Sequence, residues 1–432
     1  MGLQPRVVPG ADLWVQEHRV EVPLDHDDDS KEGKISVFVR EVRKASRSQE
    51  ELPYLLYLQG GPGFPSPRPT VPLGGWLKAA VERFRVLLLD QRGTGRSTPL
   101  QTSEVVDESI VHYRADAIVK DCEVVRQAVC GGQKLTLLGQ SFGGFCVLSY
   151  VSFFPEAIER AMLTCGLAPV GVGVDDVYRA TFRRMEARCA KFYARYPEDI
   201  ELVRRIVREL RDSPRPTPRG GTLTARRFLQ LGLLLGSGAG LESLHDLLEG
   251  AKEGITPNFV VAVERAQEAF ETNPIYWVLH ESIYCCAATQ AQPSAWAAER
   301  VQAQLGDAWD YSTRLEPGDP PILLTGEMVY SWMGDDYAAL RPLAKVAAAV
   351  AAKADWGPVY DMDVLRNSPV PTACLVSYDD IYVEREFSER VAALLGPNCR
   401  CWITNEFQHS GLRDQPVIFD RLLEMACAYL EF

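Results

Sequence analysis

The chain has 432 residues, of which 46% are hydrophobic and 24% are charged, and its formal net charge is -12. This composition is typical of a globular protein with a large buried core and excludes a fibrous or disordered chain. The acidic balance argues against nucleic acid or anionic lipid as the main partner. No apolar run approaches the length that spans a membrane.

The N-terminal stretch MGLQPRVVPGADLWVQEHRV lacks the apolar core of a signal peptide. The 11 cysteines show neither a C-x-x-C pair nor a His/Cys cluster at zinc spacing. An odd number of cysteines without a secretion signal indicates reduced thiols. We therefore expect a cytoplasmic protein with no metal site.

The first part of the chain is predicted to be rich in strands. Residues 13–24 and 34–42 alternate apolar and polar side chains, as half-exposed strands do. Residues 54–59 and 85–91 each contain a compact apolar run, YLLYL and VLLL, which is typical of strands buried on both faces. Apolar residues at helical spacing predict a helix over 114–130, ending at Gly131-Gly132.

The same alternation of strand and helix continues to about residue 169. We expect a strand at 135–139, a helix at 142–154 and a strand at 159–166. Such alternation predicts a mostly parallel sheet flanked by helices. From about 173 to 366 the pattern is mainly helical, with a proline-rich loop at 213–221.

After Pro369 the α/β pattern returns. The expected elements are a strand, a helix, a strand and a closing helix, at 370–380, 384–396, 399–408 and 414–432. The economical interpretation is an α/β core interrupted by a large helical cap, inserted before the last strands. Its parts are the first core segment, the cap and the second core segment, at 1–172, 173–366 and 367–432.

A serine lies between glycines where the strand LTLLG gives way to a helix, in Gly139-Gln140-Ser141-Phe142-Gly143. G-x-S-x-G between a strand and a helix is the nucleophile-elbow pattern, in which the turn lifts the serine hydroxyl above the sheet edge. The pentapeptide alone also fits an ordinary turn. Its position directly after the strand favours Ser141 as a nucleophile.

A serine nucleophile requires a base and an acid, which follow it along the chain in this fold. Of the six histidines only His409 lies beyond the helical region, in a loop after a strand. The acid should follow the preceding strand, where Asp379 and Asp380 stand together. We favour Asp380 as the partner of His409 and keep Asp379 as the alternative.

An oxyanion hole requires two N–H donors. One would be the backbone N–H of Phe142, directly after the serine. The other would come from the glycine-rich turn QGGPGF at 59–64, where Gly61 lets the backbone approach a substrate carbonyl closely.

Taken together, LQGGPGF, DQRGTGRST, GQSFGG, the late Asp-Asp pair and EFQHSGL resemble the proline iminopeptidases. These are serine aminopeptidases of the α/β-hydrolase fold that release N-terminal proline. The segments NPIYWVLHESIYC, LTGEMVYSWM, YDDIYVERE and ITNEFQHSGLR are similar to the longer subgroup. Gln59 stands where the shorter relatives carry histidine, which is not a triad member, so this departure leaves the expected catalysis intact.

The resemblance implies peptide substrates with a free N-terminal proline, an acyl-enzyme and no cofactor. Glu281 and Glu327 match the family's acidic positions that anchor the substrate amine, although each could instead be a solvated glutamate of a helix. The proline ring would need an aromatic slot, for which Phe142 is the best-placed candidate. Further candidates, which could also be simple core residues, are Tyr284, Tyr330 and Trp332.

Two rival interpretations share these residues. An esterase or amidase for another small acyl group would have the same triad but no reason for carboxylates near the acyl pocket. A catalytically inactive α/β hydrolase that only binds a partner would be expected to lack at least one catalytic group.

Overall fold

The computed structural model describes residues 4–8, 10–28, 33–100, 108–286 and 292–428. Within them, one sheet of nine strands runs in the order β1-β2-β3-β5-β4-β6-β7-β10-β11. These strands are β1 (Arg6–Val8), β2 (Leu13–Pro23), β3 (Lys34–Lys44), β4 (Tyr54–Leu58), β5 (Arg85–Asp90), β6 (Leu135–Gln140), β7 (Ile158–Thr164), β10 (Thr372–Ser377) and β11 (Cys399–Thr404).

The first strands are antiparallel and the remaining ones are parallel. β2 pairs antiparallel with β1 and β3, and β3 pairs antiparallel with β5. From β5 through β4, β6, β7 and β10 to β11 every pairing is parallel. Strands β4, β6 and β10 are buried along their whole length, because helices cover both faces of a parallel sheet. The expected α/β fold is therefore confirmed.

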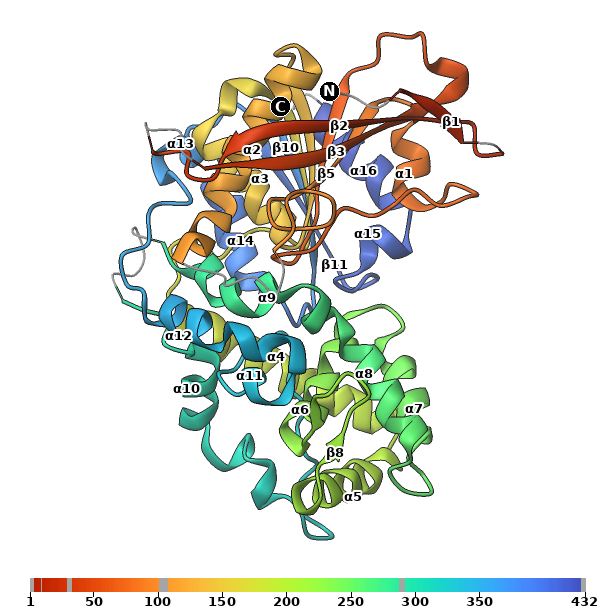
Figure 1. The fold of residues 1–432 in the computed structure, drawn as a ribbon, viewed down its shortest axis with the longest axis vertical. Coiled ribbons are helices and arrows are strands. Elements are labelled where there is room, and N and C mark those ends of the chain that lie inside the picture. The colour runs from red at the N-terminus through yellow and green to blue at the C-terminus, as the bar shows by residue number, and fades with distance from the viewer. Residues whose placement is uncertain (1–3, 9, 29–32, 101–107, 287–291, 429–432) are drawn as a thin grey trace.

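Six helices belong to this core. They are α1 (Gly75–Ala80), α2 (Ala115–Cys130), α3 (Phe142–Phe153), α14 (Arg385–Leu394), α15 (Gly411–Asp414) and α16 (Val417–Cys427) among the described residues. One hydrophobic cluster joins the sheet to α2 and α3, and a second joins its other face to α1 and α16 (Figure 1). The closing helix ends at Cys427, and the last four residues of the expected helix lie outside the described residues.

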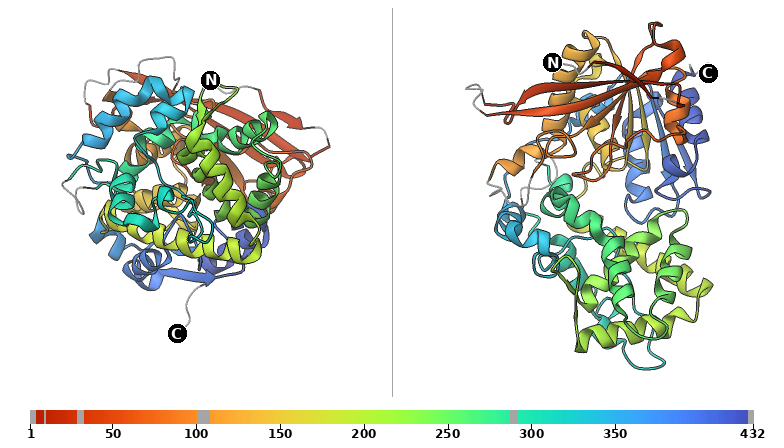
Figure 2. Two further views of the ribbon diagram at one scale, coloured as in Figure 1. Left: turned by 90° about the horizontal axis from the view of Figure 1, so that it is seen from below. Right: turned by 45° about the vertical axis from the view of Figure 1, so that its right-hand side comes forward.

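The segment from α4 to α13, which we call the cap, separates β7 from β10. Its described helices are α4 (Val174–Arg195), α5 (Asp199–Asp212), α6 (Ala225–Leu229), α7 (Gly240–Glu249), α8 (Pro257–Thr272), α9 (Pro274–Leu279), α10 (Ala297–Gln304), α11 (Met333–Asp336), α12 (Ala344–Ala352) and α13 (Met362–Arg366). In the right-hand view of Figure 2 most of the cap lies below the core that contains the sheet.

One expected loop has local strand structure. Residues 213–221 were expected to be irregular because of their prolines and glycines, but β8 (Arg215–Pro216) pairs antiparallel with β9 (Thr222–Leu223). Pro216 lies in a two-residue edge strand, a position where the missing N–H of proline costs no ladder bond. None of the described helices is both long enough and apolar enough to cross a membrane.

The carboxyl ends of the parallel strands all lie at one edge of the sheet. The loops after β4, β6, β10 and β11 carry Gly61, Ser141, Asp380 and His409 respectively. This edge adjoins the cap, so residues far apart in the sequence meet between core and cap (Figure 1).

Candidate active site

Ser141 lies on a strained turn between β6 and α3. Its φ of 55° and ψ of -128° are rare for a residue with a side chain. Helix α3 packs so closely on the sheet that a Cβ at Gly143 would lie 1.9 Å from the carbonyl oxygen of Leu58. A Cβ at Gly144 would lie 2.4 Å from the carbonyl oxygen of Gly166. Gly143 and Gly144 therefore cannot carry side chains, because backbone atoms of neighbouring segments occupy the space that a Cβ atom would need.

His409 and Asp380 form a buried hydrogen-bonded pair. The Nδ1 atom of His409 lies 2.9 Å from Oδ2 and 3.1 Å from Oδ1 of Asp380. The same carboxylate accepts hydrogen bonds from the backbone N–H groups of Tyr382 and Val383, at 2.9 and 3.1 Å. These bonds fix the carboxylate against the imidazole, which leaves Nε2 of His409 as the ring nitrogen available to a substrate or nucleophile.

Asp379 points to a different partner. Its Oδ2 atom accepts a hydrogen bond from Nζ of Lys191 on α4 at 2.6 Å, and its side chain is 30% exposed. Asp380, by contrast, is 2% exposed. Of the two adjacent aspartates, the described geometry brings Asp380 to His409.

Ser141, His409 and Glu327 line one pocket of about 250 Å³. Its other lining residues come from both core and cap, and they are Gln59, Gly60, Gly61, Phe64, Gln140, Leu233, Ala269, Phe270, Tyr276, Tyr382 and Arg413. No hydrogen bond joins the Ser141 hydroxyl to His409 among the described residues. Such bonds are often long in free enzymes and shorten when substrate binds.

The two expected oxyanion donors lie on either side of the serine turn. Gly61 lines the pocket, with a φ of 145° at which a Cβ would lie 2.8 Å from the ring of Phe64. Phe142 begins α3, where backbone N–H groups have no partner within the helix. Neither N–H donates a hydrogen bond to a described residue, so both remain available to a substrate oxygen.

Glu327 provides an acidic group in the pocket wall. It is partly buried, and the Tyr276 hydroxyl donates a hydrogen bond to its Oε1 atom at 3.3 Å. Burial and, to a smaller extent, the nearby charge of Asp380 raise the pKa of Glu327 to about 8. A cation bound beside this carboxyl group would lower its pKa again, because the positive charge stabilises the ionised carboxylate.

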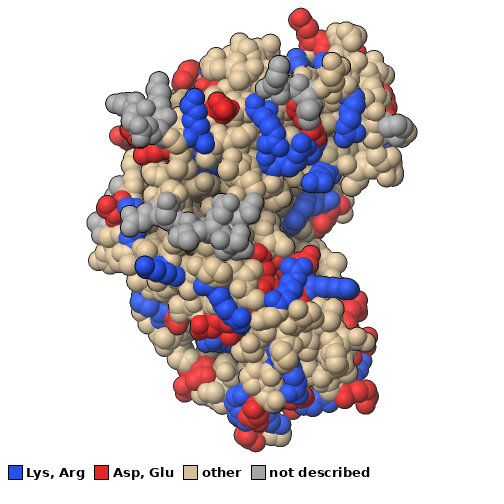
Figure 3. Space-filling view, viewed as in Figure 1, with Lys and Arg blue, Asp and Glu red and all other residues tan. Residues whose placement is uncertain are grey.

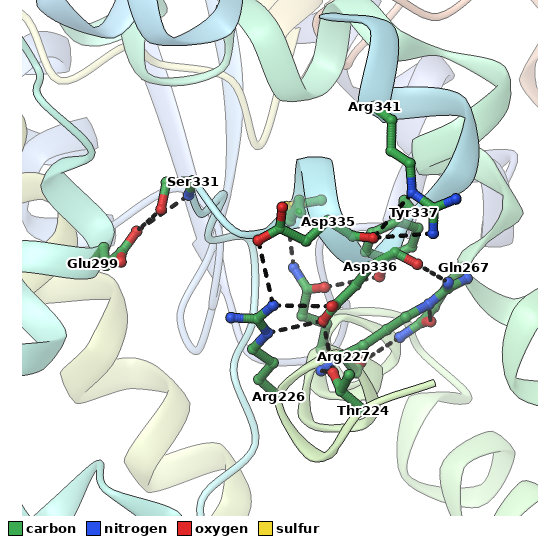
Figure 4. Close-up of polar contacts among 12 residues, drawn as sticks. Thr224, Arg226, Arg227, Gln267, Glu299, Ser331, Asp335, Asp336, Tyr337 and Arg341 are labelled. Atoms are coloured by element: carbon green, nitrogen blue, oxygen red, sulfur yellow. Dashed lines mark hydrogen bonds and ion pairs between the residues drawn. The ribbon is translucent and has the colours of Figure 1, made fainter. Parts of the chain in front are cut away.

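A polar network holds the cap elements that form the pocket wall (Figure 4). Asp336 on α11 accepts hydrogen bonds from Arg226 at 2.9 Å and from the Thr224 hydroxyl at 2.6 Å. Arg227 donates to the carbonyl oxygen of Asp336 at 2.8 Å and to Gln267 on α8 at 3.1 Å. Since α8 also carries Ala269 and Phe270, this network ties two pocket residues to α6 and α11.

The structure does not bring Glu281 into the pocket around Ser141. Its Oε1 atom accepts a hydrogen bond from the backbone N–H of Ala298 at 3.0 Å, at the start of α10. A carboxylate suits that position, because helix N-termini present unpaired N–H groups and partial positive charge. Of the two glutamates singled out in the sequence, only Glu327 lines the pocket.

The four aromatic residues proposed for the proline slot also lie outside the lining of this pocket. Phe142 and Tyr284 both pack on Phe145, each with ring centroids 6.2 Å apart. Tyr330 and Trp332 stack on each other at 5.0 Å and line a separate surface pocket with Arg226.

Four other aromatic residues line the pocket, and they were not identified from the sequence as site residues. They are Phe64, Phe270, Tyr276 and Tyr382. Three lie beside motifs that the sequence already marked, namely GGPGF, NPIYW and YDDIY, so closeness to those motifs is a signal for them. Phe270 has no such signal, because it lies in an ordinary amphipathic helix.

Cys165 is a further residue that sequence reasoning missed. It follows β7 at the same sheet edge, in a positive-φ conformation of 45°, and lies with Asp380 and His409 in a group whose polar atoms are within 4.8 Å of one another. Burial and the charge of Asp380 raise the pKa of the Cys165 thiol. The thiol therefore stays neutral beside the carboxylate.

Comparison with known proteins shows the fold and the family of the chain. Residues 53–208 match a family model described as the alpha/beta hydrolase fold. The chain is 42% identical to a proline iminopeptidase of Aeromonas sobria over 424 residues, which cover 96% of each chain. It is 31% identical to the proline iminopeptidase aneH of Aspergillus aculeatus over 417 residues, 92% of this chain and 90% of that one.

A shorter similarity extends to the archaea. A proline iminopeptidase of Saccharolobus solfataricus is 31% identical over 126 residues, or 29% of this chain and 37% of that one. The resemblance to the bacterial and fungal proteins, by contrast, includes the cap as well as the core, since it spans more than nine tenths of the chain. On this full-length similarity and on its described fold, the chain belongs to the proline iminopeptidase family of α/β-hydrolase-fold serine hydrolases.

Proposed function

We propose that this protein is a serine aminopeptidase that releases N-terminal proline from peptides. The observation that carries the proposal is the carboxyl group of Glu327 in the same pocket as Ser141 and His409. A substrate with a free N-terminus brings a cationic amine next to its first carbonyl, and a carboxylate suits that amine. A neutral ester would give no reason for an acidic group there.

In the proposed acylation step, Glu327 holds the substrate amine and Ser141 attacks the carbonyl carbon of the first residue. His409 accepts the proton of the serine hydroxyl through Nε2. Asp380 holds the imidazole in the correct tautomer and stabilises its charged form. The hydrogen bonds of Asp380 to Nδ1 of His409, at 2.9 and 3.1 Å, support this role.

The tetrahedral intermediate places negative charge on the former carbonyl oxygen. The N–H groups of Gly61 and Phe142 would bind this oxygen, each by one hydrogen bond. His409 then gives its proton to the nitrogen of the leaving peptide, and the C–N bond breaks. Water attacks the acyl-enzyme with His409 as base, which releases proline and restores Ser141.

The proline ring would lie in the apolar part of the pocket. Leu233 and Phe270 of the cap and Phe64 of the core line that region, and the Tyr276 ring lies beside Phe270 with centroids 5.5 Å apart. A small rigid ring can be enclosed there without the cost of ordering flexible bonds. We assign the proline slot to these residues in place of Phe142, Tyr284, Tyr330 and Trp332.

Two further features belong to this proposal. We treat residues 173–366 as a cap domain that restricts access to the Ser141 pocket. In the sequence, the core segments 1–172 and 367–432 precede and follow this cap. We also propose that the protein acts on peptides in the cytoplasm, a location that subcellular fractionation would test.

A panel of four substrates tests the proposed activity. It consists of proline-β-naphthylamide, its N-acetylated form, alanine-β-naphthylamide and p-nitrophenyl acetate. We expect rapid hydrolysis of the free proline amide and a large loss on N-acetylation, because the acetyl group removes the cationic amine. Strong cleavage of the ester with none of the proline amide would favour an esterase and overturn the proposal. No turnover of any substrate would favour a binding protein.

A further inference from the structure

Arg413 lies where the Ser141 pocket opens into a larger groove. It is on α15, four residues after His409, and its side chain is exposed. It lines both the pocket of about 250 Å³ and a neighbouring groove of about 760 Å³. Gln59 and Phe64 also line both, so the two spaces adjoin at these three residues.

The guanidinium of Arg413 has no ion pair with any carboxylate in the described part of the chain. Its neighbour Asp414 is engaged elsewhere, because that carboxylate accepts a hydrogen bond from the Ser410 hydroxyl. Elsewhere in the described part of the chain arginines do form such ion pairs, as Arg184 on α4 does with Glu384 at 2.5 Å. An unpaired arginine at the mouth of an acyl pocket is therefore free to bind an anionic group of a ligand.

The larger groove runs between core and cap. Its walls include the loop at 63–74, the first residues of α1 and the loop at 93–100 in the core, and residues 272–275 in the cap, together with Arg413. Figure 3 shows the surface indented at the boundary between core and cap, with Lys and Arg side chains on both sides of the indentation. The groove also contains Arg68, which has no ion pair with a described carboxylate.

The direction of a bound peptide follows from the proposed function. The amine of the first residue would lie at Glu327, and its carbonyl would lie at Ser141. The residues after the scissile bond must then leave the pocket toward open space. The groove beyond Gln59, Phe64 and Arg413 is the larger space that adjoins the pocket.

We propose that Arg413 binds the C-terminal carboxylate of a short peptide such as Pro-Xaa, so that the site has opposite charges for the two ends of a zwitterionic dipeptide. This inference rests on the proposed function and adds the substrate class. Arginine suits the task because its planar guanidinium can donate two parallel hydrogen bonds to a carboxylate. Since Arg413 is exposed, we expect an effect of about tenfold on kcat/KM.

The test compares substrates that differ only in this carboxylate. The kcat/KM ratio of Pro-Gly to Pro-Gly-NH2 is measured for the wild type, Arg413→Gln and Arg413→Lys. A matched control is Lys134→Gln, which removes an exposed positive charge just before β6, at the end of that strand opposite Ser141. We expect the ratio to fall about tenfold in R413Q, to fall less in R413K and to stay at the wild-type value in K134Q.

A carboxylate after proline can come from the C-terminus of the peptide or from an acidic side chain. Pro-Glu-NH2 distinguishes these two sources, because its C-terminus is amidated and only its side chain carries a carboxylate. If R413Q lowers kcat/KM for Pro-Glu-NH2 while the ratio of Pro-Gly to Pro-Gly-NH2 is unchanged, Arg413 binds an acidic side chain instead of the C-terminus, and the proposal is overturned. An unchanged ratio in R413Q on all substrates also overturns it. A wild-type enzyme that releases no proline from any of the peptides would instead refute the proposed function itself.

Discussion

At the scale of single residues, side chains of the same chemistry have different surroundings in this protein. Asp380 is buried against His409, while Asp379 is bound to Lys191 at the surface. Glu327 lines the Ser141 pocket, while Glu281 caps α10. The residue type alone therefore does not assign a role at these positions. A comparison of matched variants of the two aspartates, and of the two glutamates, can assign it.

The two aspartates provide the first such comparison. We expect Asp380→Asn to lower kcat on proline-β-naphthylamide by about 10³–10⁴-fold, because an amide cannot hold the His409 tautomer that accepts the serine proton. Asp379→Asn should change it by about twofold or less, since this variant removes only a partly exposed ion pair. Steady-state kinetics on both variants checks the prediction. Equal losses would contradict the assignment of Asp380.

The second comparison concerns the amine. Glu327→Gln should lower kcat/KM on proline-β-naphthylamide by about 10–100-fold, because it removes a charge-assisted hydrogen bond to the substrate cation. The loss on p-nitrophenyl acetate should be much smaller, since that ester carries no amine. Glu281→Gln should lower the thermal midpoint without changing the preference between the two substrates. The same drop on amide and ester in E327Q would exclude amine binding by Glu327.

The raised pKa of Glu327 predicts a dependence of stability on pH. The pKa is about 8 in the fold against 4.5 ordinarily, so folding favours the protonated form. The contribution of Glu327 to the free energy of unfolding is therefore fully present below pH 4.5 and is lost as the pH rises through about 8.

Thermal midpoints at pH 5, 7 and 9 measure this dependence. We expect the wild type to lose more stability than E327Q between pH 5 and 9, because glutamine has no proton to lose. Glu253→Gln, which replaces an exposed glutamate of the cap, is the control and should follow the wild type. Parallel curves for all three proteins would show that Glu327 is not protonated in the folded state.

At the scale of elements, the close packing of α3 and the polar network of the cap decide where the pocket residues lie. Helix α3 can approach β4 and the segment directly after β7 only because Gly143 and Gly144 lack side chains. In the cap, Asp336 links α11 to Arg226 and Thr224, and Arg227 links α6 to α8 (Figure 4). The pocket wall formed by α8 depends on these links.

The adjacent residues Asp335 and Asp336 provide a test of that network. Asp336→Asn should destabilise the protein by about 1–3 kcal/mol, because its buried side chain loses the charge that pairs with the partly exposed Arg226. Asp335→Asn should change stability by less than about 0.5 kcal/mol, since that side chain is 81% exposed and lies 3.7 Å from Arg226. Thermal or urea unfolding would measure both. Equal effects would show that the network does not stabilise the cap.

At the scale of the whole molecule, the core and the residues at its sheet edge could be predicted from the sequence. Buried parallel strands have continuous apolar runs, and their carboxyl ends meet at one edge, so Gly61, Ser141, Asp380 and His409 could be placed near one another. The glycines around Ser141 carried additional information, because each marks a close backbone contact.

The arrangement of the cap could not be predicted in the same way. An amphipathic helix shows which face is buried but not which element covers it. The sequence therefore did not distinguish Glu327, which lines the pocket, from Glu281, which caps α10. For the same reason Leu233 and Phe270 were missed, and Tyr330 and Trp332 were expected at a pocket whose lining does not include them.

The central claim is that Ser141 is the nucleophile that releases N-terminal proline. The most direct measurement is titration of the enzyme with a fluorophosphonate probe, with the labelled residue located by mass spectrometry and proline release measured on the same samples. We predict that Ser141 is labelled, that proline release falls in proportion to its labelling, and that folded Ser141→Ala is neither labelled nor active. Full labelling of Ser141 with proline release intact, or proline release by S141A at the wild-type rate, would contradict this account.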